Sequence, residues 1–290
     1  MSLLAFALVV LAAVIHASWN LLAKRAAHAG PAFVLAYTAV ACTVYLPWVA
    51  WLVGAGQLPW SGTALACIAA SGALHLAYNL WLQRGYQVAD LSVVYPVARG
   101  TGPLLATLGA VVLLGERPSV ARLVGLCAIV VGIVLITTQG RLSRLVDPAA
   151  RSGVRWGAST GAAIAGYTVV DAYGVKAAGL HPVVLDWCSG MLRLALMLPW
   201  FMAHRRDALQ RMRGHWGRAM LVGVLSPLSY ILVLTALRLG TPLSVTAPAR
   251  EMSMMVGALL GAWVLKESVG RGRLLGCVVM LVGVGLLAWG

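Results

Sequence analysis

Two apolar segments carry the same pattern of polar residues, in which a histidine is followed by an aromatic residue at the third position and an asparagine at the fourth. The residues are His16, Trp19 and Asn20, and then His75, Tyr78 and Asn79. In a helix, positions i, i+3 and i+4 share one face, so each segment presents an imidazole, a ring and an amide on one stripe. Such stripes suit a ligand with an apolar body and polar ends. The alternative is hydrogen bonding between helices alone; for the two stripes together we favour a substrate cavity.

Four charged residues lie within apolar runs: Arg99, Arg193, Arg250 and Glu251. A buried arginine can bind a substrate carboxylate through two parallel hydrogen bonds. It can also neutralise an internal carboxylate, and for any single arginine we favour an internal ion pair, such as Glu251 with Arg99 or Arg193. Because charge at membrane depth is costly, we expect at least one of the four to meet the substrate or a coupling proton. Arg99 and Arg250, with Tyr95, are the substrate-binding candidates.

Glu251 is also the best candidate for a residue that binds a coupling proton, since burial favours the neutral form of a carboxyl group. His16 and His75 are rivals, because imidazole titrates near neutral pH. The sequence does not decide among the three.

Prolines lie beside these arginines. Pro96 and Pro103 flank Arg99, and Pro248 precedes Arg250. A proline permits a kink, which in a transporter favours a hinge or a broken-helix site. The alternative is that membrane helices simply tolerate proline.

Four acidic residues lie near the expected ends of helices. We expect Glu116 and Glu267, which follow apolar runs and have basic neighbours, to form gate or structural ion pairs. We expect Asp171 and Asp186 to lie near helix ends and to stay solvated.

The composition requires a membrane for these segments. Of the 290 residues, 61% are hydrophobic and 10% are charged, against about 25% charged in soluble domains. A span needs about 20 apolar residues, so ten spans take up roughly 200 residues and leave no room for a separate soluble domain. The five cysteines lie in apolar runs without metal-ligand spacing, so we expect no metal site. We expect ten membrane helices, at 2–22, 32–53, 62–83, 91–114, 119–138, 154–174, 182–203, 218–239, 242–265 and 270–289.

The net charge of +14 is unevenly distributed. The loops after the first, third, fifth, seventh and ninth expected helices hold 15 lysines and arginines, and the other loops hold 4. The positive-inside rule places the basic loops in the cytoplasm and both termini on the outer side. A nucleic-acid-binding module would not be this apolar, so we expect lipid rather than nucleic acid as the partner of the basic surface.

The two halves of the chain resemble each other. Leu46-Pro47-Trp48 recurs as Leu198-Pro199-Trp200, 152 residues on, and Tyr78 as Tyr230. At a shift of 151, Ala98-Arg99 recurs as Ala249-Arg250, Glu116 as Glu267, Gly125 as Gly276 and Gly132 as Gly283. We expect five-helix repeats at 1–139 and 154–290, joined by a basic linker at 140–153. Because five is odd, the second repeat is inverted, as in many alternating-access transporters.

The sequence resembles the drug/metabolite transporter superfamily, in particular its EamA-type ten-helix exporters. The motifs are His16-Ala17-Ser18-Trp19-Asn20, then Tyr95-Pro96-Val97-Ala98-Arg99 with Leu114-Gly115-Glu116, and Ala247-Pro248-Ala249-Arg250 with Leu265-Lys266-Glu267. The resemblance covers nearly the whole chain. It implies a basket of ten helices that exports amino acids, including aromatic ones, or similar small metabolites across the bacterial inner membrane.

The first functional hypothesis is therefore a secondary exporter of amino acids or related amphiphilic metabolites. The alternative is an importer of an amine or quaternary ammonium compound, with Trp19, Tyr78 and Tyr95 as an aromatic cage. An enzyme is not expected, because the histidines form no metal-ligand pair and no nucleotide-binding loop is present. We expect no cofactor, and a monomer, because ten helices already enclose a path.

Overall fold

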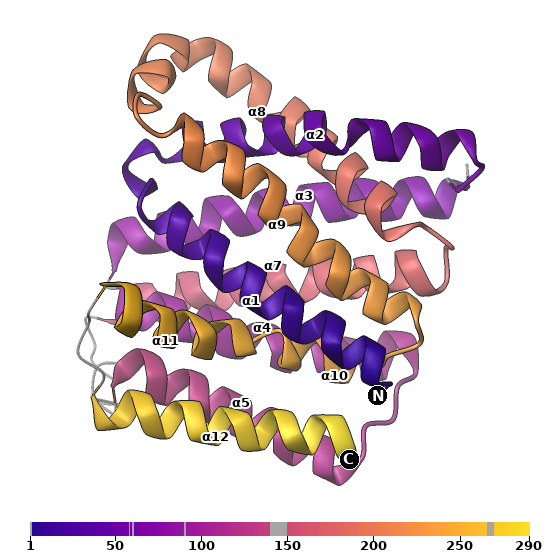
Figure 1. Ribbon diagram of the computed structural model, residues 1–290, viewed down its shortest axis with the longest axis vertical. Helices are drawn as coiled ribbons and strands as arrows, with labels where there is room; N and C mark the ends of the chain where they lie inside the picture. The colour runs from indigo at the N-terminus through magenta and orange to yellow at the C-terminus, as the bar shows by residue number, and fades with distance from the viewer. Residues whose placement is uncertain (1, 58, 60, 90, 140–149, 266–269) are drawn as a thin grey trace.

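The protein is a bundle of long helices that cross it in alternating directions (Figure 1). The computed structural model describes residues 2–57, 59, 61–89, 91–139, 150–265 and 270–290, and no strand occurs among them. The elements are α1 (Leu3–Lys24), η1 (Ala27–Ala29), α2 (Pro31–Gly54), α3 (Gly62–Val88), α4 (Leu91–Leu114), α5 (Val120–Thr138), α7 (Arg151–Lys176), α8 (Pro182–Arg211), α9 (Trp216–Arg238), α10 (Leu243–Ala249), α11 (Met252–Leu265) and α12 (Arg271–Trp289).

Most of these helices have the length and composition of membrane spans. Eight qualify among the described residues: α1, α2, α3, α4, α5, α8, α9 and α12. The less apolar α7 lies largely buried in the bundle, so it needs little lipid-facing surface. With α7, and with α10 and α11 following one another through the bundle, the chain makes the expected ten crossings.

The two sets of five helices are inverted relative to each other. The start of α1 and the end of α12 lie on the same side of the bundle (Figure 1). The five helices from α1 to α5 each cross the bundle once, so α7 starts on the side opposite to the start of α1. Packing is reciprocal: α1 packs on α9 as α7 packs on α3, and α5 packs on α12. Such exchange of equivalent partners is typical of a pseudo-two-fold axis.

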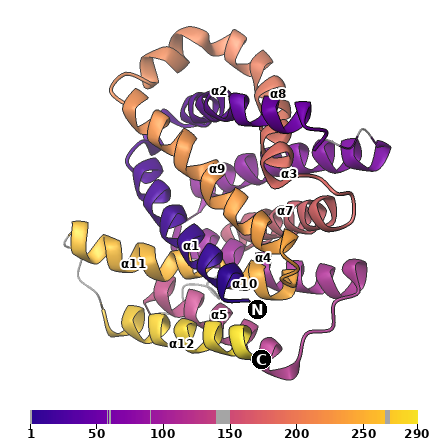
Figure 2. The same ribbon diagram turned by 45° about the vertical axis from the view of Figure 1, so that its right-hand side comes forward.

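The contact between α5 and α12, which lie side by side in both ribbon views (Figures 1 and 2), shows this symmetry in detail. A Cβ atom on Gly125 would lie 2.7 Å from the Gly283 carbonyl oxygen, and one on Gly132 would lie 2.8 Å from that of Gly276. Gly125 and Gly276 are repeat-related, as are Gly132 and Gly283. The repeat symmetry therefore maps the contact of Gly125 with Gly283 onto the contact of Gly276 with Gly132, and the absence of side chains lets the two backbones touch.

Several helices extend beyond their expected bounds, and α8 extends the furthest. α8 continues to Arg211, with a kink at His204, whereas the basic run from 204 was expected to be a loop. Ala208 and Met212 are buried in one apolar cluster with Phe33, and this packing holds the extension in place. α7 begins at Arg151, so the expected linker at 140–153 is shorter at its C-terminal end; residues 140–149 lie outside the described part of the chain.

The prolines behave differently in the two halves. α4 is continuous through Pro96 and Pro103, so of the two alternatives the tolerated proline holds in this helix. The helix containing Pro248 does break, because α10 ends at Ala249 and α11 begins at Met252. Arg250 and Glu251 occupy the break.

Candidate substrate cavity

The break between α10 and α11 is held by short-range backbone hydrogen bonds. The Glu251 N–H donates to the Pro248 carbonyl at 3.0 Å, and the Ser253 N–H donates to the Arg250 carbonyl at 3.2 Å. These three-residue bonds replace the four-residue bonds of an α-helix and tighten the turn. They aim Arg250 and Ser253 at the centre of the bundle, where both are at least 95% buried.

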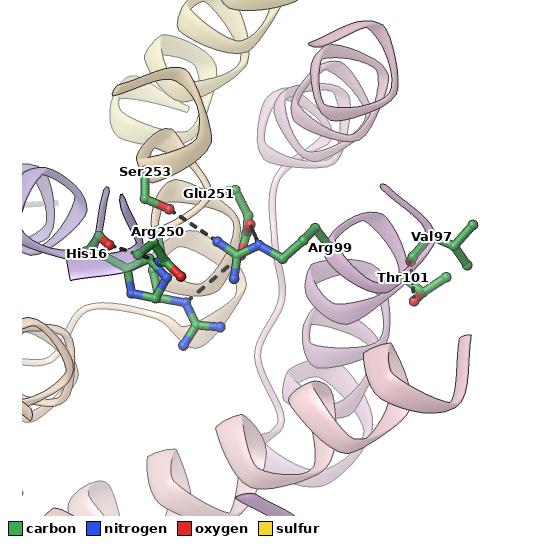
Figure 3. A network of polar contacts seen from close by, with 8 residues as sticks. His16, Val97, Arg99, Thr101, Arg250, Glu251 and Ser253 are labelled. Atoms are coloured by element: carbon green, nitrogen blue, oxygen red, sulfur yellow. Dashed lines mark hydrogen bonds and ion pairs between the residues drawn. The ribbon is translucent and has the colours of Figure 1, made fainter. Parts of the chain in front are cut away.

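Glu251 lies between two arginines that are repeat-related (Figure 3). Its Oε2 is 2.8 Å from Arg99 Nε on α4, and its Oε1 is 3.9 Å from Arg250 Nε. Arg99 Nη2 also donates to the Ser253 hydroxyl at 3.2 Å. Of the two ion pairs considered from the sequence, the structure forms the one with Arg99. One carboxylate thus faces two guanidinium groups, which leaves an excess of one positive charge.

A cavity of about 910 Å³ lies against this cluster. The nine candidate substrate-binding residues all line it: His16, Trp19, Asn20, His75, Tyr78, Asn79, Tyr95, Arg99 and Arg250. Arg193 on α8 lines it as well, whereas Glu251 is fully buried behind Arg99 and Arg250. The sequence thus predicted which residues meet around one space; their role in binding stays a prediction.

Hydrogen bonds within the two stripes argue against a purely structural role for the asparagines. The amide of Asn20 donates to the His16 carbonyl, and that of Asn79 to the His75 carbonyl, each at 2.9 Å. Each bond joins two residues of the same helix, α1 for Asn20 and α3 for Asn79, so these bonds do not connect one helix to another. Trp19 does so, since its indole N–H donates to the Ser229 hydroxyl on α9 at 3.2 Å.

One end of the cavity reaches the face of the bundle where α1 ends and α2 begins. Residues near helix ends line it there: His28, Gln87, Gln139, Arg211 and Arg273. Toward the opposite face the cavity extends to Tyr45 and Asp186. Beyond them, buried apolar residues fill the bundle, among them Leu180, Leu185, Leu237 and Leu243. The cavity therefore approaches the basic face and is closed by this apolar layer on the other.

Aromatic rings from three helices meet on the wall of the cavity. His75 stacks on Tyr167 with ring centres 3.8 Å apart, and Tyr230 lies edge-on to His75 at 5.6 Å. Tyr78 is also edge-on to Tyr167 at 6.0 Å. Neither Tyr167 nor Tyr230 was predicted from the sequence as a site residue. The repeat match between Tyr78 and Tyr230 was the signal that could have found the latter.

The expectation of a solvated carboxyl group is wrong for Asp171 but not for Asp186. Asp171 is 1% exposed, and its Oδ2 accepts a hydrogen bond from the Tyr230 hydroxyl at 2.5 Å. Asp186 is half-buried on the cavity wall. Both are near helix ends, but α3 and α9 pack over this part of α7 and remove Asp171 from water.

Glu116 forms a structural contact between the halves. Its carboxylate accepts the N–H groups of Leu243 at 2.6 Å and Ser244 at 2.9 Å, at the N-terminus of α10, and lies 3.3 Å from Lys176 Nζ. Burial alone would raise the pKa of Glu116, but the two N–H bonds and Lys176 together hold this pKa below its ordinary value. Its expected repeat counterpart, Glu267, lies outside the described residues.

Comparison with known proteins identifies the fold. A sequence model of the EamA-like transporter family matches residues 3–138 and 151–289, one copy on each half. A solved structure described only as "Crystal structure of protein" superposes with a TM-score of 0.73 over 97% of this chain and 95% of that one, at 15% identity, and so shares the fold. No curated protein matches the chain. Two matched copies that together span nearly the whole sequence show that this protein belongs to the EamA-like transporter family.

Proposed function

We propose that this protein is a secondary transporter that exports amino acids or related small amphiphilic metabolites across the bacterial inner membrane by alternating access. The observation that carries the proposal is the pairing, around one cavity, of an uncompensated positive charge with a wall of aromatic rings. An amino acid offers a carboxylate to the first and a side chain to the second.

Arg250 is the arginine that would bind the carboxylate. Arg99 is already engaged by Glu251 at 2.8 Å and by Ser253, whereas Arg250 lies 3.9 Å from Glu251. In a space shielded from water, a guanidinium with spare donors attracts a carboxylate strongly. The rings of Tyr78, Tyr167 and Tyr230 supply apolar surface for the rest of the ligand.

The charge of the two faces supports export as the direction of transport. The cavity approaches the face that carries most of the basic loops, which the positive-inside rule assigns to the cytoplasm. The termini then face outward, and the substrate enters from the cytoplasm. Residues 1–139 and 154–290 act as two inverted halves that rock about the cavity, and one monomer encloses the whole path.

Import of an amine or quaternary ammonium compound is the second candidate, supported by Asp186 and by the tyrosines on the cavity wall. The cage expected from the sequence fits it poorly. The Arg99 guanidinium lies 5.9 Å from the centre of the Tyr95 ring, so one face of this ring is occupied. Trp19 is held by Ser229.

Flux from liposomes tests the proposal. Liposomes that contain the purified protein should release preloaded radiolabelled L-phenylalanine faster than protein-free liposomes loaded in the same way. Unlabelled phenylalanine should compete with the label, whereas phenylalaninol, which lacks the carboxylate, should not. Arg250→Ala should lower the flux at least about tenfold, the effect of losing about 1.4 kcal/mol of binding. Arg205→Ala, at an exposed position on α8, is the matched control. Flux of labelled choline without any flux of phenylalanine would favour the second candidate.

A further inference from the structure

Asp171 is a buried acid that the proposed substrate site does not use. It lies five residues before the end of α7 and does not line the cavity. Its Oδ2 accepts the Tyr230 O–H, while its Oδ1 has no hydrogen-bond partner, and it forms no ion pair with any residue that the structure describes. An unpartnered oxygen on a side chain this deeply buried needs a physical explanation.

The groups around Asp171 do not compensate a full negative charge. From α3 the Ser71 hydroxyl and Cys67 lie beside it, with His75 one turn further along, and α9 contributes Tyr230. From α8, Asp186 and Arg193 act on it with opposite signs.

The other helices packed on α7 add little charge near Asp171. The titratable groups of α4, Tyr95 and Arg99, lie near the level of Gly161 on α7, two to three turns away. The described residues of α10 carry no titratable group.

The surroundings therefore favour a neutral, protonated carboxyl group. A carboxylate at membrane depth without a paired cation is costly, and proton uptake removes that cost. The protonated form also has an O–H of its own to donate, whereas the charged form has only the hydroxyl groups of Ser71 and Tyr230 to stabilise it.

Polar groups connect this carboxyl to the cavity. Tyr230 lines the cavity and donates its hydroxyl to Asp171, so its O–H lies between the two. His75 lines the cavity too, and its Nδ1 lies 2.9 Å from the Ser71 carbonyl and 3.3 Å from the Ser71 hydroxyl. The Ser189 hydroxyl donates to Ser71 at 3.2 Å. A proton can thus move between cavity water and Asp171 through hydroxyl and imidazole groups while the carboxyl stays buried.

We propose that Asp171, reached through Tyr230 and His75, is the proton-binding site that couples export to the proton gradient. This inference rests on the function proposed above. The empty transporter with its cavity toward the basic face holds the proton on Asp171. When the substrate enters the cavity, its positive ammonium group lowers the electrostatic cost of a negative charge behind Tyr230, the carboxyl O–H bond breaks, and the proton leaves through the cavity water to the cytoplasm. Asp171 is protonated again when the cavity faces outward.

Asp171→Asn tests the proposal, because it keeps the shape and an acceptor for Tyr230 but cannot release a proton. In liposomes, flux of labelled L-phenylalanine is measured once as exchange without a gradient and once driven by a pH gradient. The ratio of driven to exchange flux should fall at least tenfold in Asp171→Asn. Asp207→Asn, an exposed acid on α8, should keep the wild-type ratio. An unchanged ratio in Asp171→Asn, or a wild-type protein driven by a sodium gradient instead, would overturn the proposal.

A measurement on the wild-type protein keeps the test independent of how the variant folds. Adding L-phenylalanine to weakly buffered protein in detergent should release protons, detected with a pH-indicator dye. Tyr230→Phe removes the donor that stabilises the carboxylate, so the pH at which driven flux is half-maximal should shift upward. Phenylalanine exchange with neither proton release nor gradient dependence would refute the proton site and leave the exporter intact, whereas the absence of any exchange would refute the exporter itself.

Discussion

Glu251 and Asp171 both belong to the second half of the chain and are almost completely buried, at 0% and 1% exposure, yet their surroundings are opposite. Glu251 lies between two arginines, one of them 2.8 Å away. Asp171 has a tyrosine hydroxyl and serines but no ion-pair partner among the described residues. A carboxylate paired with arginine keeps its charge in a membrane, whereas an unpaired one takes up a proton. A carboxyl group therefore neutralises buried arginines at Glu251 and, as we propose, couples transport to protons at Asp171.

Replacing each carboxyl by its amide compares these environments directly, and Glu251→Gln should have the largest effect. It leaves the two buried arginines without a counter-charge, which should cost about 3–5 kcal/mol of stability. Thermal unfolding in detergent, followed with a thiol-reactive dye on the five cysteines, measures this. Adding Arg99→Met should recover most of the loss. A loss below about 1 kcal/mol would mean that Glu251 does not hold the arginines.

Glu116→Gln should have the second largest effect, about 1–3 kcal/mol, because hydrogen bonds to a charged acceptor are lost at the start of α10. The pH dependence gives a second test. Because the folded-state pKa of Glu116 lies below its ordinary value of 4.5, its contribution is full above that value and disappears as the pH falls through the folded-state pKa. Stability curves of wild type and variant should therefore converge on acidification; curves that stay parallel would contradict this assignment.

Asp171→Asn should change stability at neutral pH by less than about 1 kcal/mol, because a neutral carboxyl group and an amide make similar hydrogen bonds. Its loss of stability should be several times smaller than that of Glu251→Gln in the same unfolding assay. Equal losses for the two variants would show that Asp171 is charged in the folded protein.

The smallest effect is expected for Asp207→Asn. Asp207 pairs with Arg211 one helical turn away at 2.8 Å, and both side chains are 54% exposed. Exposed pairs of this kind contribute about 0.3–0.5 kcal/mol. Adding salt should abolish the difference between wild type and this variant, while the Glu251→Gln difference should persist, because salt screens exposed charges and not buried ones.

The sequence was a good guide to residues that share a helix face. The spacing of His16, Trp19 and Asn20 predicts a common stripe, and the structure places the whole stripe on the cavity. It was a poor guide to the ends of helices and to burial. The basic run after His204 continues α8, and Asp171, expected in water, is enclosed.

By itself, the sequence determined that the chain spans a membrane ten times, that its halves are inverted repeats, and which polar residues point inward. Hydropathy and helical periodicity are local properties, and a repeat is visible when the sequence is aligned with itself. Tertiary structure alone decided that Glu251 pairs with Arg99 rather than Arg193, that Glu116 binds the start of α10, and that Asp171 has Tyr230 but no cation. These contacts join positions 59 to 152 residues apart, and no local pattern encodes which distant side chains meet when the helices pack.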